Sequence, residues 1–195
     1  MRVIRGQILL VLCCFFYLIW WYRCYQPGMT VSRVSGLNGL LFLLTALFGV
    51  TGVVFSLAPV DAIKETRINP SLILAAGIAG YAVLFLITRF GFSRTVTTEL
   101  FLIVGWTTLE VSVANRLNAA GILSGRRFAA VCFITAAAFA VSMILYVAYY
   151  RMEAVKAFYS AMVPLAAAAA AMTAVIVMIG RKRPERPVNQ NRDTK

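Results

Sequence analysis

The sequence predicts an all-α, polytopic integral membrane protein built as a bundle of six transmembrane helices. Hydrophobic residues make up 61% of the 195 residues, whereas a soluble domain is usually about 45–50% apolar. They gather into six long stretches, five of which reach about 20 residues, the length that crosses a hydrocarbon core of about 30 Å. Because lipid offers backbone N–H and C=O groups no partner, each stretch is expected to form a helix.

The six spans are expected at residues 6–22, 37–58, 71–90, 95–117, 128–150 and 157–180. The first span is the shortest. It ends in bulky Trp20, Trp21 and Tyr22 rather than in the small residues of a cleavage site, so we expect it to remain uncleaved. The loops are short, which places residues 1–180 in one membrane domain. Residues 181–195 are basic and almost free of apolar residues, and we predict a disordered cytoplasmic tail.

Turn signals and one proline predict the finer organisation of the spans. Gly91 to Arg94 forms a very tight turn, so the third and fourth spans should pack as an antiparallel hairpin. Pro164 removes a backbone donor inside the sixth span, which leaves the Ser160 carbonyl without its usual partner and predicts a kink. A broken helix can present carbonyls to a substrate, although a proline in a span is more often a packing feature.

The basic residues predict the orientation, because cytoplasmic loops carry an excess of Lys and Arg. An even number of spans puts both termini on one side. The basic residues on that side are Arg2, Arg5, Lys64, Arg67, Arg116, Arg126, Arg127, Arg181, Lys182, Arg183, Arg186, Arg192 and Lys195. Those on the opposite side are Arg23, Arg33, Arg89, Arg94, Arg151 and Lys156. Both termini are therefore predicted in the cytoplasm. The short loops favour a bacterial cytoplasmic membrane, and a eukaryotic membrane is also compatible.

Composition argues against several function classes. The chain has no histidine, so mechanisms that use histidine as a base or metal ligand do not apply. The four cysteines are dispersed and form no CxxC motif, and we expect no metal site and no cofactor. The net charge of +12 follows from loop and tail residues rather than from a basic face with aromatics. The expected partner is the lipid bilayer and not a nucleic acid.

The fourth span is the most polar, and it carries the two acidic residues expected inside a span, Glu99 and Glu110. Eleven residues at about 100° each bring these side chains onto one helix face, about 16 Å apart along the axis, with Trp106 between them. An acid in a span costs a few kcal/mol, so it should face the bundle interior or a wet cavity. We predict that this helix lines a substrate or ion path, with Glu99, Glu110, Trp106, Thr107 and Asn115 as its candidate residues.

Glu99 has two interpretations, because it is expected only about one turn from the outer boundary. One is an interfacial ion pair with Arg89 or Arg94 that fixes the hairpin. The other is an entry-site carboxylate that attracts cations or senses pH.

Glu110 is expected deeper in the membrane, with no basic residue at its level. A carboxyl group without a nearby cation is costly to ionise in apolar surroundings. Three interpretations stay open: a neutral acid hydrogen-bonded within the bundle, a proton or cation relay, and a contact between subunits.

Three functions are compatible with this sequence. The first is a transporter or channel for a small solute or ion, with the fourth span lining the path. The second is an accessory or scaffolding subunit of a larger membrane complex, because small residues favour close helix packing. Besides the bilayer, the expected partners are a partner membrane subunit or a second copy of the chain. The third, less favoured, is a membrane enzyme acting on lipid, in which Glu99 or Glu110 would serve as acid or base.

Overall fold

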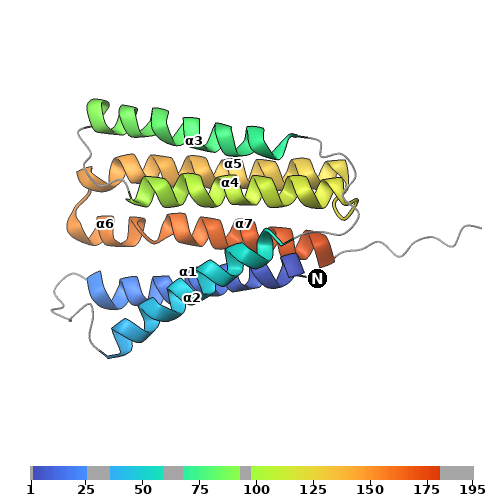
Figure 1. Ribbon diagram of the computed structural model, residues 1–195. Helices are drawn as coiled ribbons and strands as arrows, with labels where there is room; N and C mark the ends of the chain where they lie inside the picture. The colour runs from blue at the N-terminus through green and yellow to red at the C-terminus, as the bar shows by residue number, and fades with distance from the viewer. Residues whose placement is uncertain (1, 26–35, 59–67, 93–97, 181–195) are drawn as a thin grey trace, which may run out of the picture.

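The computed structural model describes residues 2–25, 36–58, 68–92 and 98–180. These residues form an all-helical chain, and six of its spans are long and apolar enough to cross a membrane (Figure 1). The helices are α1 (Arg2–Tyr25), α2 (Leu37–Ser56), α3 (Pro70–Leu86), the π-helical turn η1 (Ile87–Gly91), α4 (Thr98–Ala119), α5 (Gly125–Ala148), the 3-10 turn η2 (Tyr149–Arg151), α6 (Ala154–Ser160) and α7 (Val163–Gly180). The expected tail, residues 181–195, lies outside the described residues.

The predicted all-α fold with six apolar spans is confirmed, with shifted boundaries. Helix α1 begins at Arg2 and ends at Tyr25, whereas 6–22 was expected. The expected bounds followed the apolar stretch, and the helix continues into the polar residues at both of its ends. The third span continues from α3 into the π-helical turn η1, which the sequence did not predict. The expected start of the fourth span falls in 93–97, outside the described residues, and α4 is described from Thr98.

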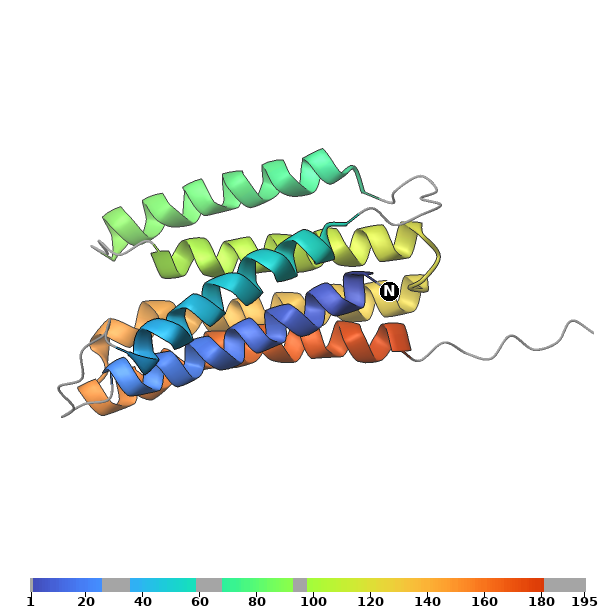
Figure 2. The same cartoon turned by 60° about the horizontal axis from the view of Figure 1, so that its bottom comes forward.

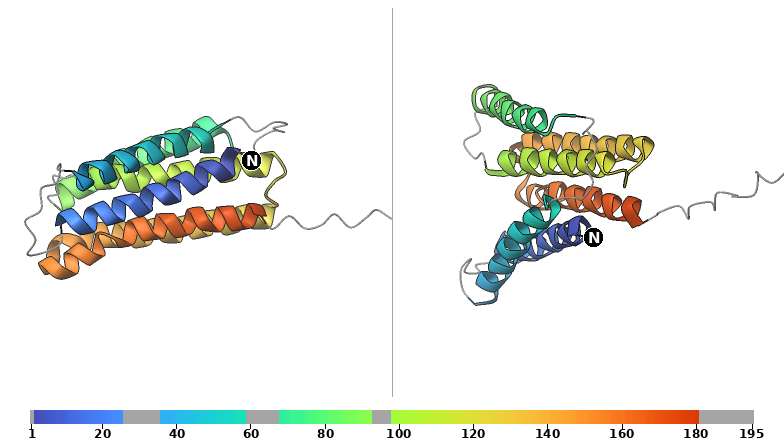
Figure 3. Two further views of the ribbon diagram at one scale, coloured as in Figure 1. Left: turned by 90° about the horizontal axis from the view of Figure 1, so that it is seen from below. Right: turned by 45° about the vertical axis from the view of Figure 1, so that its right-hand side comes forward.

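Helices α1, α4, α5 and α7 form the centre of the bundle, and α2 and α3 lie at its edges. Helix α7 contacts α1, α4 and α5, whereas α2 packs mainly on α1 and α3 mainly on α4. The right-hand view of Figure 3 shows α3 and α2 at opposite edges of the helices, with the central group between them. Ile73 is the one buried residue of α3, and most of the large apolar side chains of α2 are exposed. The edge helices therefore present most of their apolar side chains outward, as lipid-facing helices do.

Both ends of the described chain lie at the same end of the bundle, as an even number of spans requires. Arg2 begins α1 and Gly180 ends α7 there (Figure 2). The loop between α4 and α5 lies at this end, and α6 lies at the other. We call these the terminal end and the distal end.

The sixth span is broken where the sequence predicted a kink. Helix α6 ends at Ser160 and α7 begins at Val163, so Pro164 occupies the first turn of the new helix. A proline is well tolerated there, because the N–H groups of a first turn have no intrahelical acceptor. The Ser160 hydroxyl donates to the Lys156 carbonyl oxygen at 2.6 Å, within the last turn of α6.

Candidate functional site

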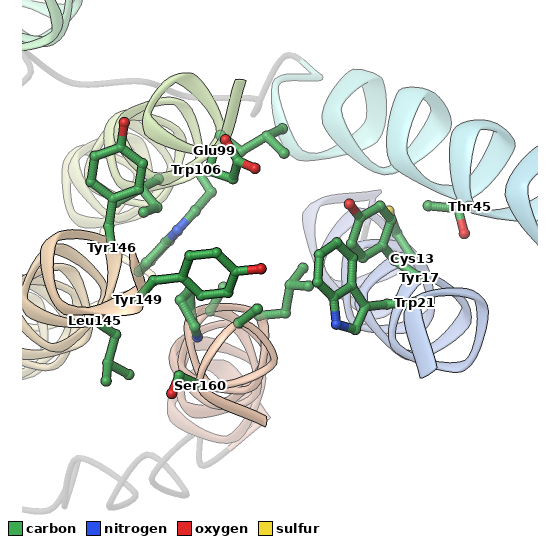
Figure 4. A pocket seen from close by; sticks show the side chains of 16 residues that line it. Cys13, Tyr17, Trp21, Thr45, Glu99, Trp106, Leu145, Tyr146, Tyr149 and Ser160 are labelled. Carbon is green, nitrogen blue, oxygen red and sulfur yellow. The ribbon is translucent and has the colours of Figure 1, made fainter. Parts of the chain in front are cut away.

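A cavity of about 160 Å³ opens in the distal half of the bundle, lined by residues of α1, α2, α4, α5, η2, α6 and α7 (Figure 4). The helix periodicity explains which side chains reach it. On α1 the lining residues are Cys13, Tyr17 and Trp21, each four positions after the last, and on α4 they include Glu99 and Trp106, two turns apart. The cavity is thus lined by whole helix faces.

The cavity wall is mostly aromatic and aliphatic. Its aromatic residues are Tyr17, Trp21, Trp106, Tyr146 and Tyr149. In Figure 4 the Tyr149 ring projects into the space between the helices, and its hydroxyl points toward the side of α1. The residues that close the wall from α6 and α7 include the broken segment around Pro164. The break therefore shapes the cavity instead of presenting a separate site.

Glu99 is the one charged residue among the described residues that line the cavity. It lies in the first turn of α4 and is exposed, so it stands where the cavity opens at the distal end. Within the described part of the chain, its carboxylate forms no ion pair. Arg89 is exposed on the π-helical turn η1 and does not pair with it. Arg94, the other expected partner, lies outside the described residues.

An apolar layer forms the floor of the cavity. Its buried members are Leu10, Ala168 and Met172, and Trp106 and Leu109 pack against them. Ala168 and Trp106 belong both to this layer and to the cavity wall. The floor therefore closes the cavity toward the terminal end of the bundle.

A buried polar cluster lies beyond that floor, one turn along α4 from Trp106. Glu110 is fully buried, and its Oε1 accepts a hydrogen bond from Gln7 Nε2 of α1 at 3.1 Å. The same Nε2 donates to Ser56 Oγ of α2 at 3.3 Å. Glu110 Oε2 and Gln7 Oε1 are buried and have no hydrogen-bond partner among the described residues. We call Gln7, Ser56 and Glu110 the polar cluster.

Glycines let α1 and α2 approach closely enough to build this cluster. A Cβ at Gly6 would lie 2.5 Å from Ser56 Oγ and 2.8 Å from the Phe55 carbonyl carbon. One turn further, a Cβ at Gly52 would lie 2.8 Å from Leu10 Cγ. Any side chain at Gly6 would therefore push α2 away from α1 and carry Ser56 away from Gln7.

The two remaining candidate residues of α4, Asn115 and Thr107, lie outside both the cavity and the polar cluster. Asn115 is fully buried, donates from Nδ2 to the Ile68 carbonyl oxygen at 2.7 Å and accepts from the Ile68 N–H at 3.2 Å. It fixes the backbone that leads into α3 and lies away from the cavity. Thr107 donates to the Ile103 carbonyl oxygen at 2.7 Å and lines an outer groove between α3, α4 and α5. Of the five predicted path residues, Glu99, Trp106 and Glu110 therefore lie along one face of α4, from the cavity to the polar cluster.

Gln7 is the main site residue that sequence reasoning did not single out. It is fully buried and supplies the described hydrogen-bond donor to Glu110. An amide at the start of an apolar span is a usable signal, since polar groups in spans are costly and need hydrogen-bond partners. Its position near the start of the first span made it resemble an interfacial residue.

The fold and site define a class, namely all-helical proteins with six helices long and apolar enough to span a membrane, which hold a distal aromatic cavity above a buried carboxyl–amide pair. Within the described residues, no three His, Cys, Asp or Glu side chains gather closely enough to hold a metal ion. Comparison with known protein families, curated proteins and solved structures finds no match to this chain.

Proposed function

We propose that this chain is a transporter or channel for a small solute or ion, with α4 lining the path. The observation that carries the proposal is the order of three features along one face of α4: the distal cavity with Glu99, the apolar floor at Trp106, and the buried polar cluster at Glu110. A cavity closed by an apolar layer above a buried carboxyl group is the arrangement expected of a gated path that binds a solute and moves a proton or cation.

The proposal includes an orientation. The excess of basic residues in the loops and tail that the sequence assigns to the side of the two termini supports placing both termini in the cytoplasm. The cavity would then open to the outside of the cell, in a bacterial cytoplasmic membrane. The path would run from Glu99 inward toward Glu110, which would serve as the relay group.

The test is solute flux in proteoliposomes, with the Glu110→Gln variant as the decisive comparison. We expect at least one class of small solute, presented as pools of amines, amino acids, sugars and inorganic ions, to enter faster than into protein-free vesicles. Glu110→Gln should abolish or uncouple that flux, because an amide cannot exchange a proton at neutral pH. The variant keeps an oxygen that can accept from Gln7, so the bundle should remain folded.

The matched control is Glu153→Gln, the same chemical change at an exposed residue that pairs with Lys156 at 3.3 Å. It should transport like the unmodified protein. Flux of wild-type magnitude and coupling in Glu110→Gln would remove Glu110 from the path. Absence of flux for every pool would reject transport altogether.

A second candidate function, a subunit of a larger membrane complex, is favoured by small residues exposed on α3. Gly77 packs against Thr108 within the chain, but Ala75 and Ala79 are exposed, four residues apart on the same helix. Small residues at this spacing let helices approach closely. Native mass spectrometry in mild detergent distinguishes the candidates: a stoichiometric protein partner supports the subunit, and a monomer or homo-oligomer supports the transporter.

A further inference from the structure

The chemistry of the cavity wall restricts the ligands that the cavity can hold. The described lining residues include no Lys or Arg, so an anion would meet the Glu99 carboxylate without a compensating charge. Two of the wall hydroxyls are already used as donors, because Thr45 donates to the Leu41 carbonyl oxygen at 2.9 Å and Ser160 to that of Lys156. The polar groups left for a ligand therefore belong mainly to the aromatic residues and Glu99, and the rest of the wall is carbon, which offers few partners to the several hydroxyls of a polyol.

An inorganic cation fits the wall poorly as well. Calcium and magnesium take six or more oxygen ligands, several of them carboxylates or carbonyls. Glu99 is the only acid among the described lining residues, and most of the wall is carbon. Such an ion would lose its hydration shell without gaining an equivalent set of ligands.

A cation that carries its charge on an organic group fits both parts of the wall. Aromatic rings attract such cations when the charge lies within about 6 Å of the ring centre, and the attraction is stronger in a desolvated site. Tyr17, Trp21, Trp106 and Tyr149 supply rings from three of the helices around the cavity, and Glu99 supplies the opposite charge at its opening. The rings and the carboxylate together select for positive charge on an apolar body.

The size of the cavity further restricts which organic cations can bind in it. Its volume of about 160 Å³ is close to that of the engineered protein cavity of about 150 Å³ that holds benzene. A ligand of roughly six to eight non-hydrogen atoms is therefore accommodated. Choline, with about seven non-hydrogen atoms, falls within this range, and tetramethylammonium and n-butylammonium, with about five each, are small enough to enter the same space.

We infer that the distal cavity binds a small organic cation, a quaternary ammonium or protonated amine, between the aromatic rings of α1, α4 and η2 and the Glu99 carboxylate. The inference names the substrate class of the transport proposed above and rests on that proposal only for the cation's passage through the membrane. Binding itself is a separate property of the cavity. A cation that packs against Trp106 would contact the apolar floor directly. Binding of the cation could thus act on the layer that closes the path.

The experiment is calorimetric titration of the full-length protein in mild detergent with matched ligands. The cations are choline, tetramethylammonium and n-butylammonium. The comparison ligand is 3,3-dimethyl-1-butanol, which has the shape of choline with a neutral carbon in place of the charged nitrogen. We expect saturable binding of at least one cation and, for choline against its neutral analogue, at least about tenfold tighter binding of the cation.

Variants test the two parts of the wall separately. Glu99→Gln should weaken cation binding about tenfold or more, whereas Glu153→Gln, the same change at the distal end but outside the cavity, should leave it unchanged. Tyr149→Leu should weaken binding, and Tyr149→Phe, which keeps the ring and removes the hydroxyl, should retain it. The Tyr149 pair remains informative if Glu99→Gln fails to fold.

The outcomes separate this inference from the proposed transport. Cation binding without cation flux in proteoliposomes would reject transport of the cation and leave the binding site in place. The site would be overturned by equal binding of choline and its neutral analogue, by saturable binding of none of the three cations up to 10 mM (about −2.7 kcal/mol at this Kd), or by a folded Glu99→Gln that binds like the unmodified protein. Flux of another solute without cation binding would reject the site while supporting transport.

Discussion

Gln7 links three helices through one amide group. Its Nε2 donates both to Glu110 of α4 and to Ser56 of α2, at 3.1 Å and 3.3 Å. Among the described residues, the Glu110 carboxyl group is thus paired with an amide and with no cation, as expected of an acid that is neutral at rest and, in the proposed path, exchanges its proton. The oxygens of the pair that lack described partners lie in the interior, where an unpaired polar atom is costly.

Replacement of Gln7 should make the energetic cost of a buried polar atom without a partner measurable. In Gln7→Leu, the Glu110 carboxyl group loses its described donor while it stays buried, so we expect a loss of about 1–2 kcal/mol in stability. The measurement is thermal unfolding in detergent. Ser56→Ala, which removes only the longer bond, is the matched control and should change stability less.

The double variant Gln7→Leu with Glu110→Leu completes the comparison. Replacement of both partners by apolar groups removes the unpaired polar atoms, so the double variant should be more stable than Gln7→Leu alone. Losses that simply add would show that the two side chains do not interact.

At the scale of the elements, glycine placement decides how closely helices pack. Gly6 lies against Ser56 of α2, whereas a Cβ at Gly80 of α3 would meet nothing within 4 Å. The same residue type therefore has different roles in the two helices. At Gly6 it permits the close approach that joins Gln7 to Ser56, and at Gly80 it faces the open outer groove.

Substitution of these glycines should separate the two roles. Gly6→Ala should lower stability by about 1–3 kcal/mol, because the new Cβ must displace backbone and not a flexible side-chain end. Gly80→Ala should be neutral or slightly stabilising, since alanine is the better helix former by about 1 kcal/mol. Thermal unfolding in detergent measures both, and equal effects would contradict the difference in packing between the two positions.

At the scale of the whole molecule, the bundle divides into two ends with different chemistry. The terminal end holds the described chain ends and the Asn115–Ile68 contact, and the distal end holds the cavity and Glu99. The polar cluster lies between them, behind the apolar floor. In the proposed transport, the end that faces the cytoplasm decides whether the cavity would receive solutes from outside the cell or from within.

Cysteine labelling tests the proposed orientation. Ser124, between α4 and α5, is exposed at the terminal end, and Glu153 is exposed at the distal end. In intact cells, a membrane-impermeant maleimide should modify Glu153→Cys but should reach Ser124→Cys only after permeabilisation. The unmodified protein gives the background from its own cysteines. The reverse pattern would place the termini outside and the cavity opening inside.

The number and positions of the spans, the break near Pro164 and the shared face of Glu99, Trp106 and Glu110 could all be predicted from the sequence. Each depends on a local rule: apolar length, a missing backbone donor, or the rotation of about 100° per residue. Asn115 and Thr107 were predicted to line the path because they are polar residues of the same span. In the structure, Asn115 binds the Ile68 backbone and Thr107 lines an outer groove.

Apolar length and composition were enough to specify six helices able to span a membrane, with an acidic fourth helix, because lipid forces apolar segments of this length to satisfy their own backbone hydrogen bonds. The meeting of Gln7 with Glu110, 103 positions away along the chain, emerged only from the packing of the helices. The same holds for the cavity that Tyr17, Trp106 and Tyr149 enclose. Such pairings depend on how each helix is rotated about its axis and against which neighbour it packs, and the apolar faces of these helices are too uniform for the sequence to specify that rotation.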